Sequence, residues 1–212
     1  MGSILDDYHV LTAKSCFEKA DAATITVIAG YLSPYWGRNS QVKYADRIYK
    51  HDRDLAIIFL KRPFTFTETV KPLKIIGPEK MNLDVDKAYP SPCAIVGFEL
   101  AQYLEQADFI PRETAYQLVY EKFDDKNCTA CFKYDDKKDK TLFCTDGKSE
   151  FTWGHMGSPT VITIEKEYVQ MGVIINGICN KKTPSDTKID PNLHVRIDRH
   201  YRWIKANSFI GR

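Results

Sequence analysis

The sequence predicts an all-β protein, folded as two packed antiparallel β-barrels or as one long sandwich, that ends in a short helix. Three observations predict this class. Short apolar runs rich in Val, Ile, Thr and aromatic residues recur along the chain, as β-strands favour. Turn signals separate these runs. A junction near residues 77–90 divides them into two strand-rich halves, and no internal repeat relates the two halves.

Ten runs carry the strand pattern. The expected strands are Tyr8–Ala13, Thr24–Ala29, Gln41–Tyr49, Leu55–Leu60, Cys93–Phe98, Ala115–Tyr120, Thr141–Cys144, Thr160–Ile164, Val169–Ile175 and Leu193–Ile197. The tail departs from this pattern, because Tyr201, Ile204 and Phe209 lie near helical spacing. We expect Asp198 to cap this segment and Gly211 to follow it, which predicts a short helix over residues 198–208.

The composition excludes several classes of function. Hydrophobic residues make up 43% of the chain and charged residues 27%, as in folded globular proteins. The net charge of +2 is too balanced to predict a nucleic-acid or membrane-surface partner. No run of apolar residues is long enough to predict a transmembrane helix. The first residues lack the apolar core of a signal peptide, so we expect any export signal to have been removed.

The cysteines point to an oxidising compartment. Six cysteines lie scattered along the chain, at positions 16, 93, 128, 131, 144 and 179. Cys128 and Cys131 form one C-x-x-C pair, but no second pair completes a zinc site, so we expect no metal and no cofactor. Asn127 begins an N-x-T sequon, which predicts a glycan on an exposed loop of a secreted protein.

Three separated segments stand out by their motifs: Val10–Cys16 (VLTAKSC), Asp54–Ile57 (DLAI) and Gly154–Pro159 (GHMGSP). In this order they resemble the Ala-Ala-His-Cys, Asp-Ile-Ala-Leu and Gly-Asp-Ser-Gly-Gly-Pro segments of the trypsin and chymotrypsin family of serine proteases. By this resemblance Ser15 stands at the place of the catalytic histidine and Met156 at the place of the nucleophilic serine. Asp54 retains the aspartate that orients the histidine.

The resemblance spans nearly the whole chain, since CAIVGF at Cys93–Phe98 and WIK at Trp203–Lys205 also match the family. It implies one domain with a chymotrypsin-like fold of two packed six-stranded antiparallel barrels, the first over residues 1–85 and the second over 86–197. The family's opening strand precedes anything in this chain. If that strand is lacking, we expect the first barrel to have an open edge and Cys16 to be a free thiol.

The replaced residues predict a protein without peptidase activity. Peptide hydrolysis in this family needs an oxygen nucleophile whose proton is removed by a base. The thioether of Met156 has no ionisable proton, and the hydroxyl of Ser15 cannot act as a base near neutral pH. Losing either group costs on the order of 10⁶ in turnover. We therefore expect a pseudoprotease in which Asp54 survives as a hydrogen-bond acceptor.

The substrate cleft departs from the family as well. His155, beside Gly154, replaces the aspartate that in active relatives pairs with the freed amino terminus and shapes the oxyanion hole. Glu150 aligns with the base of the primary specificity pocket, and Asn192 aligns with a glycine of its wall. The resemblance therefore implies an occluded pocket and a remnant of the oxyanion loop.

The resemblance also implies one disulfide. Cys128 and Cys144 match a conventional disulfide of the family, whereas Cys93 and Cys179 lack their usual partners. A rearranged pair among Cys93, Cys131 and Cys179 stays open at this point.

The segment Gly2–Ala13 (GSILDDYHVLTA) further resembles the inactivated protease paralogues of parasitic mites, which are related to the group 3 allergens. That resemblance implies a secreted protein of the digestive tract that binds host defence proteins such as complement components. Two alternatives stay open. One is a hydrolase with an unconventional nucleophile that uses Cys16 or His155, and the other is a non-cutting cofactor of a protease cascade.

Overall fold

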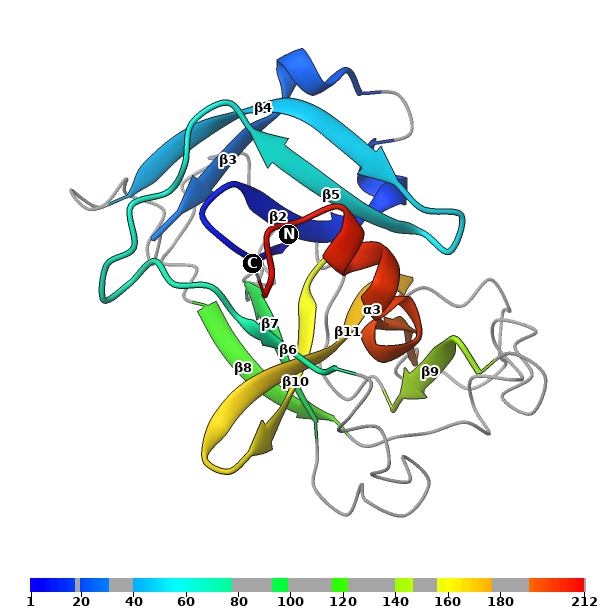
Figure 1. Ribbon diagram of the computed structural model, residues 1–212. Coiled ribbons are helices and arrows are strands. Elements are labelled where there is room, and N and C mark those ends of the chain that lie inside the picture. Colours follow the sequence, from blue (N-terminus) through cyan, green and yellow to red (C-terminus); the bar gives the residue numbers. More distant parts are fainter. Residues whose placement is uncertain are drawn as a thin grey trace, which may run out of the picture.

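The computed structural model describes residues 1–17, 20–30, 40–77, 93–98, 116–121, 140–146, 156–176 and 191–211. Two curled β-sheets pack against each other, and the helix α3 (Ile197–Ala206) lies beside the second sheet (Figure 1). Across these described ranges, no helix is long and apolar enough to cross a membrane.

The first sheet has five strands in the order β1-β2-β5-β4-β3. They are β1 (Ser3–Ile4), β2 (His9–Ala13), β3 (Thr26–Ala29), β4 (Gln41–Lys50) and β5 (Leu55–Leu60). Two 3-10 helices, η1 (Lys14–Phe17) and η2 (Ala22–Thr24), lie between β2 and β3. The carboxylate of Asp21 accepts a hydrogen bond from the backbone N–H of Ala23 and so caps η2.

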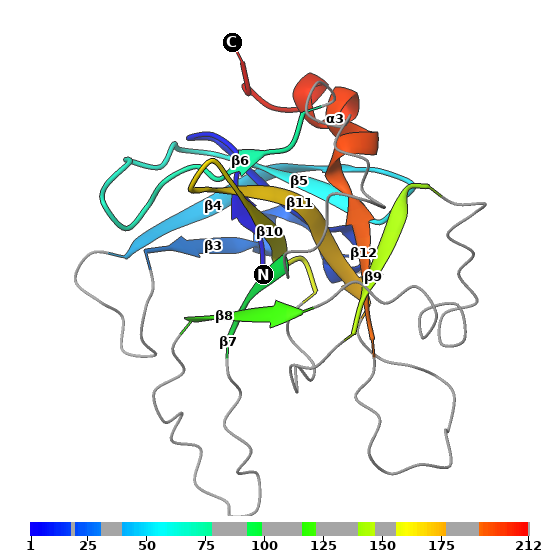
Figure 2. The same cartoon turned by 90° about the horizontal axis from the view of Figure 1, so that it is seen from below.

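The second sheet has seven strands in the described part of the chain, with the main order β8-β7-β10-β11-β12-β9. They are β6 (Lys74–Ile75), β7 (Cys93–Phe98), β8 (Tyr116–Glu121), β9 (Leu142–Thr145), β10 (Pro159–Ile164), β11 (Glu167–Asn176) and β12 (Asn192–Arg196). The turn between β10 and β11 places Glu165 and Lys166 at φ 51° and 67°, the backbone that a tight hairpin turn requires. Figure 2 shows the strands of the two sheets from below.

The side chains of the central strands β2 and β5 point alternately to two sides and contribute to two parts of the core. In β2 and β5, Val10 pairs with Ile58 and Leu11 pairs with Ile57. Because successive side chains point to opposite faces of a strand, the first pair packs in a cluster inside the first sheet and the second pair in a cluster shared with the other sheet and α3. Both strands are therefore buried on both faces, which explains why β5 is a continuous apolar run.

The sequence-based prediction of an all-β fold with two antiparallel units and a short C-terminal helix is confirmed. Each of the ten expected strands is present, with its ends within two residues of those expected. Among the described residues the strands divide into five and seven, and not into six and six. The reason is β6, which lies within residues 1–85 but pairs in parallel with β11 of the second sheet.

The helix differs from its prediction at both ends. It begins at Ile197, so Asp198 lies in its first turn and is not its cap. The side chain of Asp198 instead accepts hydrogen bonds from Arg196, at 3.1 Å from Nε and 2.8 Å from Nη2. At the other end the N–H of Asn207 bonds to the last carbonyls of the helix, which therefore ends at Ala206 and not at residue 208.

Candidate functional site

Ser15 and Asp54 are in direct contact. The pairing of β2 with β5 ends at Ala13 and Leu55, so the residues just outside this pair, in η1 and in the turn before β5, lie side by side. One oxygen of the Asp54 carboxylate accepts a hydrogen bond from the backbone N–H of Ser15 at 2.7 Å, and the other accepts from its hydroxyl at 2.9 Å. The carboxylate thus holds η1 against the start of β5.

The backbone of Asp54 adopts an unusual conformation. Its φ of 59° lies in the left-handed region, which aspartate tolerates better than most residues. The carbonyl of Asp54 also accepts a hydrogen bond from the N–H of Lys14 at 3.0 Å, and the turn closes through a bond from His51 N–H to Leu55 O at 2.8 Å. These bonds fix the direction in which the carboxylate points.

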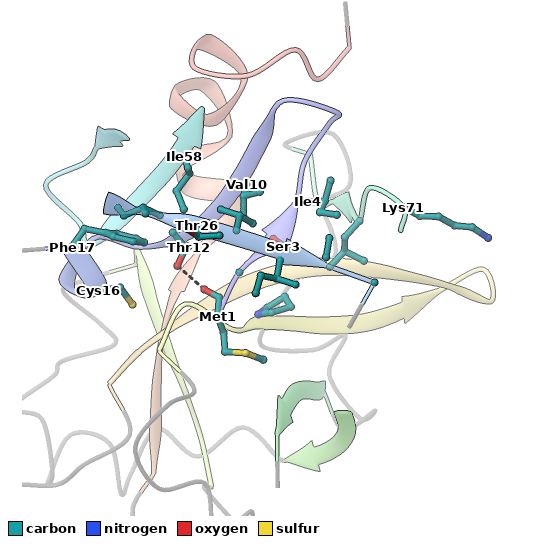
Figure 3. A pocket seen from close by; sticks show the side chains of 18 of the residues that line it. Met1, Ser3, Ile4, Val10, Thr12, Cys16, Phe17, Thr26, Ile58 and Lys71 are labelled. Atoms are coloured by element: carbon teal, nitrogen blue, oxygen red, sulfur yellow. Dashed lines mark hydrogen bonds between the residues drawn. The ribbon is translucent and has the colours of Figure 1, made fainter. Parts of the chain in front are cut away.

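Met156 lies close to η1, the 3-10 helix that contains Ser15 and Cys16 (Figure 3 shows the Cys16 side chain). Its side chain is 36% exposed, and its carbonyl accepts contacts from the thiol of Cys16 at 3.6 Å and from the amino group of Met1 at 3.2 Å. The next residue, Gly157, has a φ of 86°, and a Cβ there would collide with the hydroxyl oxygen of Thr12. The loop can approach β2 this closely only because residue 157 is a glycine.

These contacts bring together all three positions that carry the resemblance to serine proteases. Ser15 and Asp54 bond to each other, and Met156 contacts Cys16, the neighbour of Ser15 in η1. The hydroxyl of Ser15 donates a hydrogen bond to the Asp54 carboxylate, and the thioether of Met156 has no proton to donate. The side chain at position 156 therefore offers no oxygen nucleophile, and the Asp54 carboxylate is engaged by Ser15.

Several predicted site residues lie outside the described residues. They are Glu150, Gly154 and His155 of the cleft, and Asn127 and Cys128 of the predicted glycan and disulfide. Cys144 is disulfide-bonded, and its partner also lies outside the described residues, so the pair with Cys128 stays a prediction. Cys16 is an exposed free thiol at the site.

Asn192, the predicted side chain in the pocket wall, is placed at the start of β12. It is 3% exposed and lies opposite Thr145 of β9 in the strand register. Its burial fits a side chain that fills space in the second sheet. Because Glu150 lies outside the described residues, the structure leaves the occluded pocket as a prediction.

His194 is a buried polar residue of this region that the sequence analysis did not single out. Its ring nitrogens lie 2.8 Å from the hydroxyl of Thr145 and 2.7 Å from the hydroxyl of Thr160, and its ring stacks on Phe143 at 4.6 Å. Burial lowers the pKa of His194 to about 3. It lies on the same face of β12 as Asn192, because the two residues are two positions apart. The one sequence signal was a histidine inside an apolar strand.

A neutral imidazole with both nitrogens engaged cannot serve as a replacement base near neutral pH. No cluster of three or more His, Cys, Asp or Glu side chains in the described ranges could hold a metal ion. The described part of the site therefore offers an exposed thiol and a hydrogen-bonded serine–aspartate pair as its reactive or polar groups.

We predict that the Ser15–Asp54 contact stabilises the fold. A double-mutant cycle of Ser15→Ala and Asp54→Gly should give a coupling energy of about 1 kcal/mol, because the serine hydroxyl bonds to a half-buried carboxylate. The measurement is urea unfolding of the four proteins. Asp54→Gly suits the cycle because glycine has no side-chain acceptor and adopts the positive φ of this position without strain. Additive effects of the two substitutions would show that the contact contributes nothing.

Nearly the whole chain, and not only the three motifs of the site, matches a known family. The family model described as Trypsin matches residues 1–204, which include every strand of both sheets and most of α3.

Proposed function

This chain belongs to the trypsin family, and from that premise we propose that it is a proteolytically inactive member that acts by binding another protein. One observation carries the proposal. Where the family's motif has its catalytic histidine and serine, this chain has Ser15 and Met156, and the Ser15 hydroxyl already donates to the carboxylate of Asp54.

The reaction chemistry of the family supports the proposal that this chain has no peptidase activity. The attacking oxygen must lose a proton to a base as the tetrahedral intermediate forms, and the same base must then protonate the leaving amine. A methionine in place of the nucleophile and a serine in place of the base remove both proton transfers. Losses within one catalytic unit do not add, so turnover near the background is expected from either replacement alone.

What the fold retains supports a binding role. A folded, disulfide-bonded domain without its reaction still presents the surfaces of a protease, and these can compete for the partners of active relatives. By resemblance to the inactivated mite paralogues, we propose that the protein is secreted and interferes with host defence, with complement components as partners. A non-cutting cofactor of a protease cascade is the alternative partner class.

The first experiment measures peptidase activity and labelling of the active-site nucleophile. The unmodified chain is exposed to a fluorophosphonate probe and to a library of peptide substrates, beside the double variant Ser15→His, Met156→Ser. We expect neither labelling nor turnover from the unmodified chain. Labelling of the double variant alone would show that the remaining cleft is competent and that these two residues account for the inactivity.

A second experiment tests the alternative that the chain is a hydrolase with Cys16 as its nucleophile. Cys16 is an exposed thiol next to Met156, so any residual hydrolysis is tested again in Cys16→Ser. Turnover by the unmodified chain that disappears in Cys16→Ser would overturn the proposal in favour of a thiol nucleophile. Binding is measured separately with purified complement components on an immobilised chain, with an inhibitor-blocked active trypsin as the matched fold control.

A further inference from the structure

The outer side of the helix α3 carries three cations. Arg199, Arg202 and Lys205 follow one another at intervals of three residues, and all three side chains are exposed. Because a helix rises about 1.5 Å per residue, these cations succeed one another about every 4.5 Å along its axis. Figure 2 shows that α3 lies outside the two sheets. We call these three side chains the basic face of α3.

The charge of the basic face is not balanced within α3. Asp198 is the one acidic residue of the helix, and its buried carboxylate accepts two hydrogen bonds from Arg196. The Nε of Arg199 lies 3.7 Å from this carboxylate, which Arg196 already engages. Arg202 and Lys205 form no ion pair with the described part of the chain. The basic face therefore keeps its positive charge, although the whole chain carries a net charge of only +2.

The stability of the helix does not account for this arrangement of charges. Arg199 lies in the first turn of α3, where the helix dipole disfavours a positive charge. Residues three positions apart are neighbours on a helix surface, so Arg202 is repelled by both Arg199 and Lys205. Of the three cations, Lys205 alone lies in the last turn, where the dipole favours it. The cations at 199 and 202 thus weaken the helix and suit a surface that binds an anionic partner.

The opposite side of α3 anchors the helix to both sheets. Ile197 and Ile204 are fully buried in the core cluster that the two sheets share. The ring of His51, in the turn between β4 and β5, contacts His200 and Trp203 with centroid distances of 4.7 and 4.8 Å. The basic face therefore lies on a packed element, and a partner meets cations whose backbone is already in place.

We propose that the basic face of α3 binds a linear sulfated polysaccharide. Sites for small anions are concave and enclose their ligand, whereas a row of exposed cations matches a chain of anionic groups. Such a chain binds without a cavity, because each cation that contacts it releases a counterion. The disulfide at Cys144 indicates an oxidising compartment, and sulfated polysaccharides are the polyanions of the extracellular space.

The other side chains of α3 favour a polysaccharide over a nucleic acid or an anionic membrane. Proteins that bind single-stranded nucleic acids place exposed aromatic rings among their cations, whereas Tyr201 and Trp203 are half-buried. A helix that lies on a membrane inserts large apolar side chains, but Ala206 is the one exposed apolar residue of α3. This inference goes beyond the proposed binding of a protein partner, and it does not depend on the absence of peptidase activity.

The test is a titration of a fluorescent heparin octasaccharide with the full chain, followed by anisotropy at a series of NaCl concentrations. We expect saturable binding whose logarithmic affinity falls with the logarithm of the salt concentration, with a slope of about −2 for three cations. The variant Arg199→Gln, Arg202→Gln should bind at least tenfold more weakly, and its slope should shrink to about −1 or less. Desulfated heparin should also bind the unmodified chain at least tenfold more weakly.

The matched control is Lys61→Gln, Arg62→Gln. These two exposed cations follow β5 in the first sheet, and their substitution lowers the net charge by the same amount. The control should bind the octasaccharide as the unmodified chain does. Circular dichroism should show that Arg199→Gln, Arg202→Gln is folded, because the substitutions remove repulsion from the helix and leave its buried side unchanged.

Three outcomes would overturn the inference. Equal losses in the two double variants would mean that affinity follows net charge and not the basic face. Equal binding of desulfated heparin would show that sulfate groups are not recognised. Tighter binding of single-stranded DNA or of anionic phospholipid vesicles than of heparin would assign the face to one of those partners instead. None of these results alters the peptidase assay, so the two proposals fail separately.

Discussion

Acid is expected to lower the free energy of unfolding by up to about 5 kcal/mol between pH 6.5 and pH 3 through one side chain, His194. Burial lowers the pKa of His194 from 6.5 to about 3. Between these values the unfolded chain binds a proton that the folded chain does not bind. The unfolded state therefore gains stability as the pH falls through this window, and stability returns as the pH rises.

The matched variant is His194→Gln. A glutamine can bond to the hydroxyls of Thr145 and Thr160, as the imidazole does, but it does not titrate. Urea unfolding at a series of pH values should show a steeper loss of stability in the unmodified chain than in the variant, with a difference of about 2 kcal/mol already at pH 5. Parallel pH profiles would show that the ring is protonated in the folded state and that the prediction is wrong.

The strands could be predicted because each carries its signal locally. The run Leu55–Leu60 is apolar throughout since its two faces pack in two different clusters, and β-branched residues mark most other strands. Strands β1 and β6 were missed because each has two residues and no periodicity to detect. The pairing of Lys74 with Val169 in addition depends on a segment far along the chain, whereas Ser3 pairs with Leu11 in the next strand.

The site could be predicted in part. The motifs located Ser15, Asp54 and Met156, but the bond between Ser15 and Asp54 depends on η1, which tightens the chain directly after β2. No motif pointed to His194, and its environment could not be predicted from the sequence. The strand pattern predicts which side of β12 it faces, yet its two hydroxyl partners come from β9 and β10, whose positions only the folded sheet determines.

The largest single-residue loss of stability is expected for Asp198→Leu. Arg196 and Asp198 are both buried, and the guanidinium donates two hydrogen bonds to the carboxylate. Removing the carboxylate leaves a buried positive charge without its main partner, which should cost about 3 to 5 kcal/mol in unfolding free energy. The exposed Arg199, whose Nε lies 3.7 Å from the same carboxylate, adds little to this cost.

The double variant Arg196→Met, Asp198→Leu separates the cost of an unpaired charge from the value of the pair. A buried ion pair can be replaced by apolar residues at little cost, because its attraction is offset by the desolvation of both charges. We therefore expect the double variant to recover most of the stability lost in Asp198→Leu, with Asp198→Asn intermediate since its amide oxygen still accepts one bond from Arg196. Urea unfolding of these variants decides the point. A double variant as unstable as Asp198→Leu would mean that Asp198 acts through the first turn of α3, where a negative charge favours the helix dipole, and not through Arg196.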